Sequence, residues 1–254
     1  MRIEVAGHTH VGMKRNHNED SYLLMPEERL FCVADGMGGH SSGEIASKIA
    51  VDEIQEFFRL TGQDLDATWP YKMDKTRNYD ENRLATAIKL ANMRIYERAN
   101  AEQKFKGMGT TVVTVHYASN VAYVGHVGDS RVYFFRNGQL RQVTEDHSLL
   151  NDYLKAKKHT PEENEAFPHK NVIVRALGMK DTVQVDVNRF ETQEGDIFLL
   201  CSDGLSGMVS DAQIQDTLTR VPDIDAAAKQ LIDLANQNGG NDNVTCIITR
   251  WRAN

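Results

Sequence analysis

Short apolar or alternating runs dominate the chain, and this pattern predicts β-strands. The runs cover residues 3–11, 20–25, 30–34, 110–117, 121–127, 131–136, 183–190, 197–202 and 243–251. Asn137-Gly138 follows one of them and predicts a type I′ turn, and therefore a hairpin. Strands that are joined by tight turns pair in the antiparallel sense.

Between these strands, apolar residues recur at helical spacing over residues 42–59, 81–102, 210–219 and 224–237. Such stripes are typical of helices that pack on a core. The order of strands and helix pairs predicts an α+β fold, a four-layer α-β-β-α sandwich in which helix pairs flank two antiparallel sheets. No break in composition marks a boundary, so we expect a single domain over residues 1–254, with a flap subdomain at about 147–180.

The net charge of the 254-residue chain is -7, and no basic block is present. An acidic chain of this kind is a poor candidate for nucleic-acid binding. Cys32, Cys201 and Cys246 lie singly in apolar runs, which argues against a disulfide framework and favours a reducing compartment. No apolar stretch approaches the ~20 residues of a membrane span. We therefore expect a cytoplasmic protein.

Acidic residues recur at the edges of the predicted strands. Asp35 directly follows the run at 30–34 and precedes Gly36. Other acids lie next to other apolar runs, namely Glu19, Asp20, Asp129, Asp203 and Asp242. Carboxylates that folding brings together repel one another and raise each other's pKa unless a cation lies between them. Oxygen ligands without a Cys or His pattern favour Mg²⁺ or Mn²⁺ over Zn²⁺.

This set of residues suits phosphate ester hydrolysis. Two divalent cations held by carboxylates can bridge a water and make it a hydroxide near neutral pH, which could attack phosphorus in line. A phosphate group also needs a cation that grips its oxygens, and the planar fork of arginine pairs two of them at once. Arg15, four residues before Glu19, is the candidate.

Seven short motifs occur in the order of the metal-dependent protein phosphatases, the type 2C serine/threonine phosphatases, and the chain resembles a bacterial member. The resemblance spans about residues 5–250 and rests on Arg15-Asn16-His17-Asn18-Glu19-Asp20, Asp35-Gly36-Met37-Gly38-Gly39-His40, Gly109-Thr110-Thr111, Gly128-Asp129-Ser130-Arg131, Asp146-His147-Ser148-Leu149, Ser202-Asp203-Gly204-Leu205 and Asp242-Asn243-Val244-Thr245.

The resemblance implies the same sandwich, with the metals in a cleft at one sheet edge. It implies that Asp35 bridges two metal ions and that the Gly36 carbonyl binds one of them. Asp203 and Asp242 would hold the other ion.

The remaining roles are also implied by the resemblance. Glu19 and Asp20 would act directly or through metal-bound waters, and Arg15 would bind the substrate phosphate. Asp129, with Asp203, matches the position of a third, weaker metal in bacterial relatives.

The segment after Asp146 corresponds to the family's flap, whereas Gly109-Thr110-Thr111 and Ser148 look structural. Met37 stands where eukaryotic members have a histidine that is proposed as general acid, and a thioether cannot donate a useful proton. We expect a metal-bound water to protonate the leaving group, with His40 as the alternative.

The implied activity is Mg²⁺- or Mn²⁺-dependent hydrolysis of phosphoserine and phosphothreonine in proteins, without a covalent phosphoenzyme. Substrates of serine/threonine kinases, and a kinase itself, are the expected partners of a monomer. Two alternatives stay open. A non-catalytic phosphoprotein-binding pseudophosphatase predicts gaps among the metal carboxylates, and none is present. A small-molecule phosphomonoesterase would use the same metals and phosphate clamp.

Overall fold

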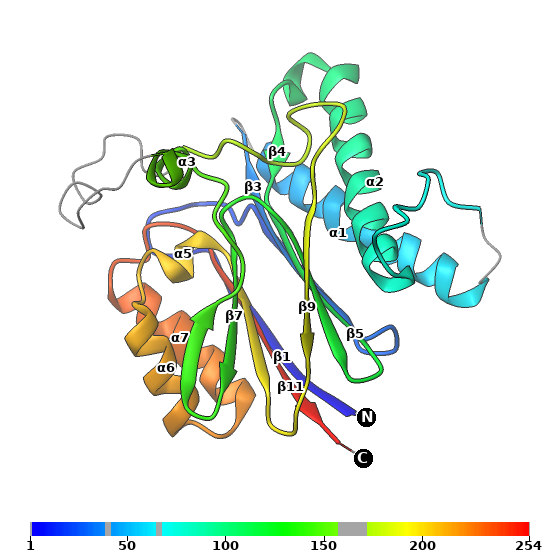
Figure 1. Cartoon of the computed structure of the whole chain (residues 1–254). Coiled ribbons are helices and arrows are strands. Elements are labelled where there is room, and N and C mark those ends of the chain that lie inside the picture. The colour runs from blue at the N-terminus through cyan, green and yellow to red at the C-terminus, as the bar shows by residue number, and fades with distance from the viewer. Residues whose placement is uncertain (1, 39–41, 65–67, 157–171, 254) are drawn as a thin grey trace.

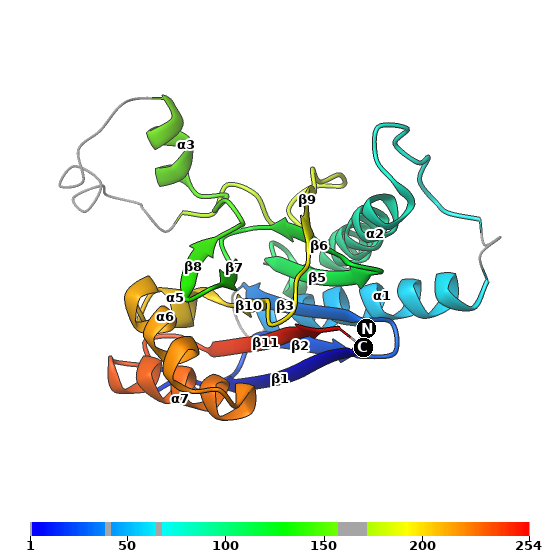
Figure 2. The same ribbon diagram turned by 60° about the horizontal axis from the view of Figure 1, so that its bottom comes forward.

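Two antiparallel sheets lie face to face, and helices cover the outer face of each (Figures 1 and 2). The computed structural model describes residues 2–38, 42–64, 68–156 and 172–253. Both described ends of the chain lie on two strands that pair with each other, and the N-terminal one forms the edge of its sheet (Figure 1). The α+β sandwich expected from the pattern of strands and helices is therefore confirmed.

The first sheet has the order β1-β11-β10-β7-β8. Its strands are β1 (Arg2–His10), β7 (Arg131–Arg136), β8 (Gln139–Gln142), β10 (Ile197–Cys201) and β11 (Val244–Arg252). Asn137 and Gly138 join β7 to β8 with φ values of 53° and 78°. Positive φ at both positions is what a type I′ turn requires, so the predicted hairpin is confirmed.

The second sheet has the order β2-β3-β5-β6-β9, and a short strand, β4, pairs with β3. Its strands are β2 (Asp20–Met25), β3 (Leu30–Met37), β4 (Gly109–Thr110), β5 (Val112–Ala118), β6 (Val121–Val127) and β9 (Asp186–Glu191).

The helices pair on the two outer faces, as the apolar stripes predict. Helices α1 (Ser42–Gln63) and α2 (Tyr79–Ala101) share a buried cluster with the second sheet, and α6 (Asp211–Arg220) and α7 (Ile224–Gln237) share one with the first. In the described residues no helix is long and apolar enough to cross a membrane.

Two short elements were not predicted, namely a 3-10 turn (Gln103–Phe105) and α5 (Asp203–Ser206), whereas the short helix α3 (Leu149–Ala156) lies in the segment expected to form the flap. Strand β9 begins three residues later than the predicted run at 183–190. Within the proposed flap, residues 157–171 lie outside the described part of the chain, and its standing as a subdomain stays a prediction.

The layer between the sheets is built from aromatic and branched side chains. Phe198 on β10 is fully buried, and its ring lies 4.9 Å from Phe134 and 6.0 Å from Tyr117, centroid to centroid. Tyr117 belongs to the opposite sheet, so Phe198 contacts both faces of the sandwich. Burial of aromatic area at such a position dominates the local packing energy.

We expect Phe198→Ala to lower the free energy of unfolding by about 3–5 kcal/mol, because it leaves a cavity between two sheets that cannot collapse onto it. Urea unfolding of the metal-free protein measures this change. Leu60→Ala, at a half-exposed position on α1, is the control and should cost well under half as much. Equal losses in the two variants would contradict the assignment of Phe198 to the central core.

Candidate metal centre

The pairing of β2 with β3 places two of the candidate acids opposite each other. Asp20, the first residue of β2, is the register partner of Asp35 on β3. Glu19 lies immediately before β2, and its carbonyl oxygen accepts a hydrogen bond from the Gly36 amide at 3.1 Å. A side chain on Gly36 would collide with the Gly43 carbonyl at the start of α1, so this position requires glycine.

The other three acids come from the ends of neighbouring elements. Asp203 begins α5 directly after β10, Asp242 precedes β11, and Asp129 follows β6. Burial raises the pKa of Asp35 well above its ordinary value. Repulsion by Asp20, Asp203, Asp129 and Asp242 adds to that rise. Acids that lie more than 200 positions apart in the sequence thus form one cluster.

Two carboxylates in the cluster carry a buried oxygen without a protein partner. Asp20 Oδ2 accepts hydrogen bonds from Ser202 Oγ at 2.8 Å and Thr245 Oγ1 at 2.6 Å, but Asp20 Oδ1 has no hydrogen-bond partner among the described residues. Asp129 Oδ1 is also buried and unpartnered. Burial raises the pKa of both groups to about 7, and Asp203 repels each of them.

The pKa values of Asp203 and Glu19 are also raised. Burial raises the pKa of Asp203, and repulsion by Asp242 adds to the effect, although a hydrogen bond with Asp35 opposes it. Burial is also the main reason that the pKa of Glu19 is raised. A buried group of acids with unpartnered oxygens and mutually raised pKa values is the donor set expected for hard divalent cations. The residues therefore fit the predicted metals, and their individual roles as ligands stay predictions.

Arg15 lies at the same cluster, in contact with one of its acids. Its Nη2 donates to Asp242 Oδ2 at 2.6 Å, and about half of its side chain is exposed. The guanidinium borders a cleft of about 450 Å³ lined by Lys14, Arg15, Asn16, His17, Glu19, Gly38 and Asn243. An exposed arginine beside a metal-type acid cluster can reach a phosphate that enters this cleft.

Asn243 connects the segments that line this cleft, a role that no motif in the sequence indicated. Its Oδ1 accepts a hydrogen bond from the Glu19 amide at 2.8 Å. Its Nδ2 donates to the carbonyls of Val11 and His17, both at 2.9 Å. Its position between Asp242 and an apolar run could have marked Asn243 as a candidate residue, but the sequence alone does not reveal its hydrogen-bond partners.

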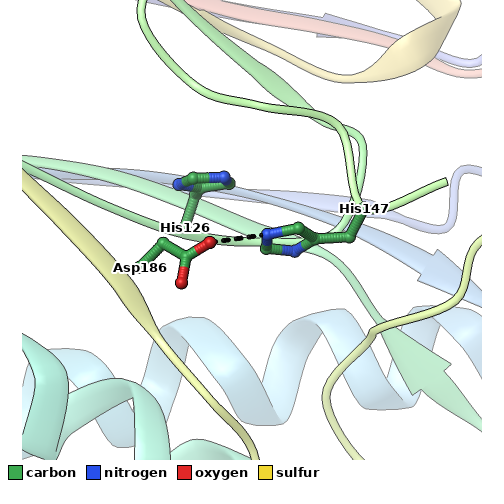
Figure 3. A group of neighbouring side chains, drawn as sticks. All are labelled: His126, His147 and Asp186. Carbon is green, nitrogen blue, oxygen red and sulfur yellow. Dashed lines mark hydrogen bonds and ion pairs between the residues drawn. The ribbon is translucent and has the colours of Figure 1, made fainter. Parts of the chain in front are cut away.

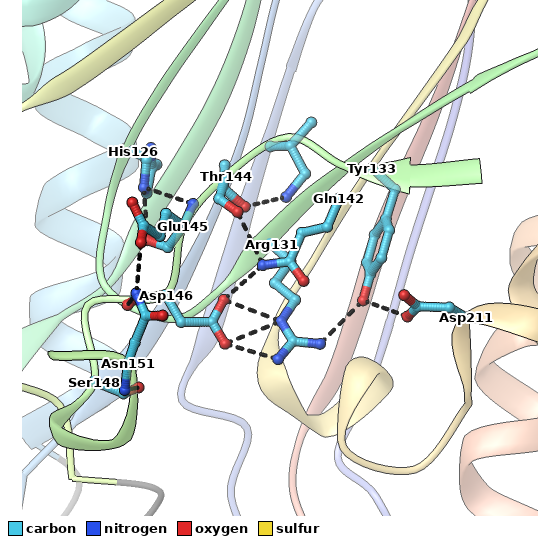
Figure 4. Close-up of polar contacts among 11 residues, drawn as sticks. His126, Arg131, Tyr133, Gln142, Thr144, Glu145, Asp146, Ser148, Asn151 and Asp211 are labelled. Atoms are coloured by element: carbon cyan, nitrogen blue, oxygen red, sulfur yellow. Dashed lines mark hydrogen bonds and ion pairs between the residues drawn. The ribbon is translucent and has the colours of Figure 1, made fainter. Parts of the chain in front are cut away.

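The guanidinium of Arg131, two residues from Asp129, is paired with an acid outside the cluster. It forms a two-pronged ion pair with Asp146, with nitrogen–oxygen distances of 2.7 to 3.2 Å, and also donates to Tyr133 Oη (Figure 4). This pair lines a second cavity of about 260 Å³ together with Asp129 and Asp203.

Thr111 supports the acid cluster, in line with the structural role expected for its motif. Its hydroxyl accepts a hydrogen bond from the Asp35 amide at 3.1 Å. Met37 ends β3, where its thioether offers no proton. His40, the alternative proton donor, lies outside the described residues.

A β-sandwich whose sheet edge carries a buried acid cluster beside an exposed arginine has the architecture of a metal-dependent phosphohydrolase. The sequence profile of the family described as protein phosphatase 2C matches residues 6–247. The chain therefore belongs to the protein phosphatase 2C family.

Relatives in sequence and structure are similar over nearly the whole chain. The protein phosphatase PhpP of Streptococcus pneumoniae is 36% identical over 246 residues, which cover 96% of this chain and 95% of that one. The serine/threonine phosphatase PstP/Ppp of Mycobacterium tuberculosis has a TM-score of 0.87 and 33% identity, with 100% of both chains covered. A structure of the PstP catalytic domain with 2 manganese ions has a TM-score of 0.82 and 33% identity, over 99% of each chain.

The raised pKa of Asp20 makes the stability of the metal-free protein depend on pH. An acid whose folded-state pKa exceeds its unfolded value stabilises the fold below about pH 4, and this contribution is lost as the pH rises through about 7. Asp20→Asn removes the penalty and puts an amide nitrogen in place of the unpartnered oxygen. We expect the variant to be more stable than wild type by roughly 1–4 kcal/mol at pH 8, with a smaller difference at pH 5.

Thermal unfolding in chelator at the two pH values tests this expectation, and added Mn²⁺ should stabilise wild type more than Asp20→Asn. Asp225→Asn is the control, because burial does not strain that exposed carboxylate and its loss should not stabilise the fold. A metal-free Asp20→Asn protein that is less stable than wild type at pH 8 would refute the picture of a strained acid.

Proposed function

We propose that this protein is a Mn²⁺- or Mg²⁺-dependent phosphatase that hydrolyses phosphoserine and phosphothreonine in proteins. The observation that carries the proposal is the buried acid cluster, with unpartnered oxygens on Asp20 and Asp129, beside the guanidinium of Arg15. The names of its relatives support the substrate class, and the manganese-containing relative supports the cofactor.

In this proposal Asp35 would be a ligand of both cations, the Gly36 carbonyl would bind one of them, and Asp203 and Asp242 would hold the other. The carboxyl of Asp35 lies near enough to Asp203 to influence its pKa, which supports the assignment of both to one metal centre. Repulsion between Asp203 and Asp242 supports a cation between those two.

Glu19 and Asp20 complete the site directly or through water, and Asp129 with Asp203 would hold a third, weaker ion. Support for the third site comes from the buried, unpartnered Asp129 Oδ1, which lies at the second cavity together with Asp203. Ser202 and Thr245 keep Asp20 oriented by donating to its other oxygen.

The chain's own groups favour direct attack by water over a covalent phosphoenzyme. When bound, divalent cations supply acidified water and offset the negative charge of the phosphate. The three cysteines are buried, and burial raises their thiol pKa values, so none is a thiolate nucleophile. The Ser202 hydroxyl is oriented toward Asp20 and lies buried.

Arg15 would bind and orient the phosphate at the mouth of the cleft. Its guanidinium can exchange Asp242 for phosphate oxygens once cations neutralise that carboxylate. A carboxylate and a phosphate can each accept two parallel hydrogen bonds from arginine. Met37 is not a proton donor, so protonation of the serine or threonine oxygen falls to water at the site or to His40.

The expected partners are proteins phosphorylated by serine/threonine kinases, including a kinase itself. We further propose that the protein works as a cytoplasmic monomer with one catalytic domain and a flap at about residues 147–180. Three free, buried cysteines support a reducing compartment. The net charge of -7 supports protein rather than nucleic-acid substrates.

Phosphate release from a phosphothreonine peptide tests the activity directly. We expect turnover with Mn²⁺ or Mg²⁺, none with chelator, and a loss of roughly 100-fold or more in Asp203→Ala, because loss of a metal ligand should exceed the 10- to 100-fold effect of an outer-shell change. Asp225→Ala is the control for an acid outside the cluster. A folded, metal-saturated protein without activity would favour the pseudophosphatase, and faster turnover of sugar phosphates or nucleotides would favour the small-molecule enzyme.

Arg15→Ala should lower kcat/KM for the same peptide by roughly 10- to 100-fold, the range expected for loss of charge-assisted hydrogen bonds worth about 1.5–3 kcal/mol. Mn²⁺ affinity measured by calorimetry should not fall, because Arg15 competes with cations for Asp242. Arg15→Lys should recover only part of the loss, since it restores charge without the fork. Lys14→Ala, next along the same cleft, should have a smaller effect, and the assignment is wrong if it matches Arg15→Ala.

A further inference from the structure

The turn that carries Asp129 is tied to β3 on one side. Thr111 exchanges hydrogen bonds with Asp35, since its amide donates to the Asp35 carbonyl at 2.9 Å and its hydroxyl accepts from the Asp35 amide at 3.1 Å. The same hydroxyl lies 2.7 Å from Ser130 Oγ. One threonine thus links the strand of the bridging acid to the turn at Gly128-Asp129-Ser130.

On the other side the turn is tied to His147. The His147 amide donates to the Gly128 carbonyl at 2.9 Å, and the Gly128 amide donates to His147 Nδ1 at 3.0 Å. Gly128 has a φ of 111°, and a Cβ atom there would lie 2.6 Å from Thr111 Cβ. The residue that precedes Asp129 is therefore held between Thr111 and a buried histidine.

Asp186 fixes the tautomer of that histidine. Because Nδ1 accepts from Gly128, the neutral ring carries its proton on Nε2, which donates to Asp186 Oδ2 at 2.8 Å (Figure 3). Hydrogen bonds to a carboxylate fix the tautomer and orientation of a histidine ring, as is well known for histidines at metal sites.

His147 and Asp186 also connect the Gly128-Asp129 turn to the described ends of the proposed flap. The Val174 amide donates to the His147 carbonyl at 2.9 Å, and the Leu149 amide donates to the Val172 carbonyl at 2.8 Å. Arg175 Nη1 lies 3.1 Å from Asp186 Oδ2. Chain segments on both sides of residues 157–171 therefore meet at His147.

A metal at His126, His147 and Asp186 is a competing interpretation, because their ligand atoms lie within 4.8 Å of one another. The two imidazole rings, however, are stacked, with centroids 4.8 Å apart and planes 15° from parallel (Figure 3). A nitrogen lone pair lies in the plane of its ring, so two parallel rings cannot both point at one ion. Arg175 also places a positive charge 3.0 Å from His147 Nε2.

We propose that His147, oriented by Asp186, is a positioning residue that holds the Gly128-Asp129 turn and couples Asp129 to the flap ends. The inference rests on the proposed function, because it takes Asp129 as a ligand of the weakest cation. His147 touches neither that cation nor the substrate in this scheme. It acts through the backbone of Gly128.

Calorimetric titration of Mn²⁺ into metal-free protein tests the proposal with variants at His147. His147→Leu removes the acceptor for the Gly128 amide and should weaken the weakest site by about 10- to 100-fold, with little change at the tighter sites. His147→Asn places Oδ1 where Nδ1 was and should restore most of the affinity. Amide hydrogen exchange at Gly128 should be faster in the leucine variant only.

A second variant keeps the test independent of how well His147→Leu folds. Asp186→Ala should shift the His147 tautomer, seen in its ring ¹⁵N chemical shifts, and should weaken the same site. His8→Leu is the matched control, because His8 also pairs with an aspartate, Asp225, at 2.6 Å, but on the face of β1 that packs against α7. It should leave every Mn²⁺ site unchanged.

The outcomes separate the two proposals. Wild-type protein that binds no Mn²⁺ would overturn the proposed function. Normal binding by wild type together with unchanged weak-site affinity in both His147→Leu and Asp186→Ala would overturn this inference alone. New Zn²⁺ binding that is lost in His147→Leu and His126→Leu, with unchanged Mn²⁺ affinity, would overturn it in favour of a histidine metal site.

Discussion

Repulsion among buried carboxylates is the constraint on which the rest of the site depends. Burial raises the pKa of Asp20, Asp35, Asp129 and Asp203, and repulsion by neighbouring acids adds to each rise, so the fold holds these groups together against their own charge. Hydroxyl groups of Ser202, Thr245 and Thr111 orient the cluster, but they supply no positive charge. A divalent cation removes the repulsion, which links metal binding to the stability of the whole sandwich.

The sandwich makes this arrangement possible because its two sheets end at a common edge. Asp20 and Asp35 come from β2 and β3 of one sheet, whereas Asp203 and Asp242 adjoin β10 and β11 of the other. The aromatic layer around Phe198 holds the sheets at a constant separation, and interiors packed to this density resist deformation. Rigid strands thus fix carboxylates that flexible loops alone could not hold.

Much of the fold could be predicted from the sequence. Strands that are buried on one or both faces carry alternating or continuous runs of apolar residues, and such runs can be recognised. The acids could be found because each one adjoins such a run. The short helix α5 could not be predicted, because a single helical turn at Asp203 is too short to show a helical repeat of apolar residues. The same limit applies to ion pairs. That Arg131 is committed to Asp146 while Arg15 reaches Asp242 depends on side-chain directions from distant elements, and no local pattern in the sequence encodes them.

The turn between β2 and β3 has a consequence for how the chain can vary. Residues 26–29 close this hairpin, with the Arg29 amide donating to the Pro26 carbonyl at 3.2 Å and Arg29 at a φ of 53°. Because the side chains of a strand alternate between faces, a slip of one residue would turn Asp20 out of the cluster and bring Ser21 opposite Asp35. A surface turn at the far end of the strand therefore determines whether the acid cluster forms, and insertions that shift the pairing there should be as damaging as loss of one of its acids.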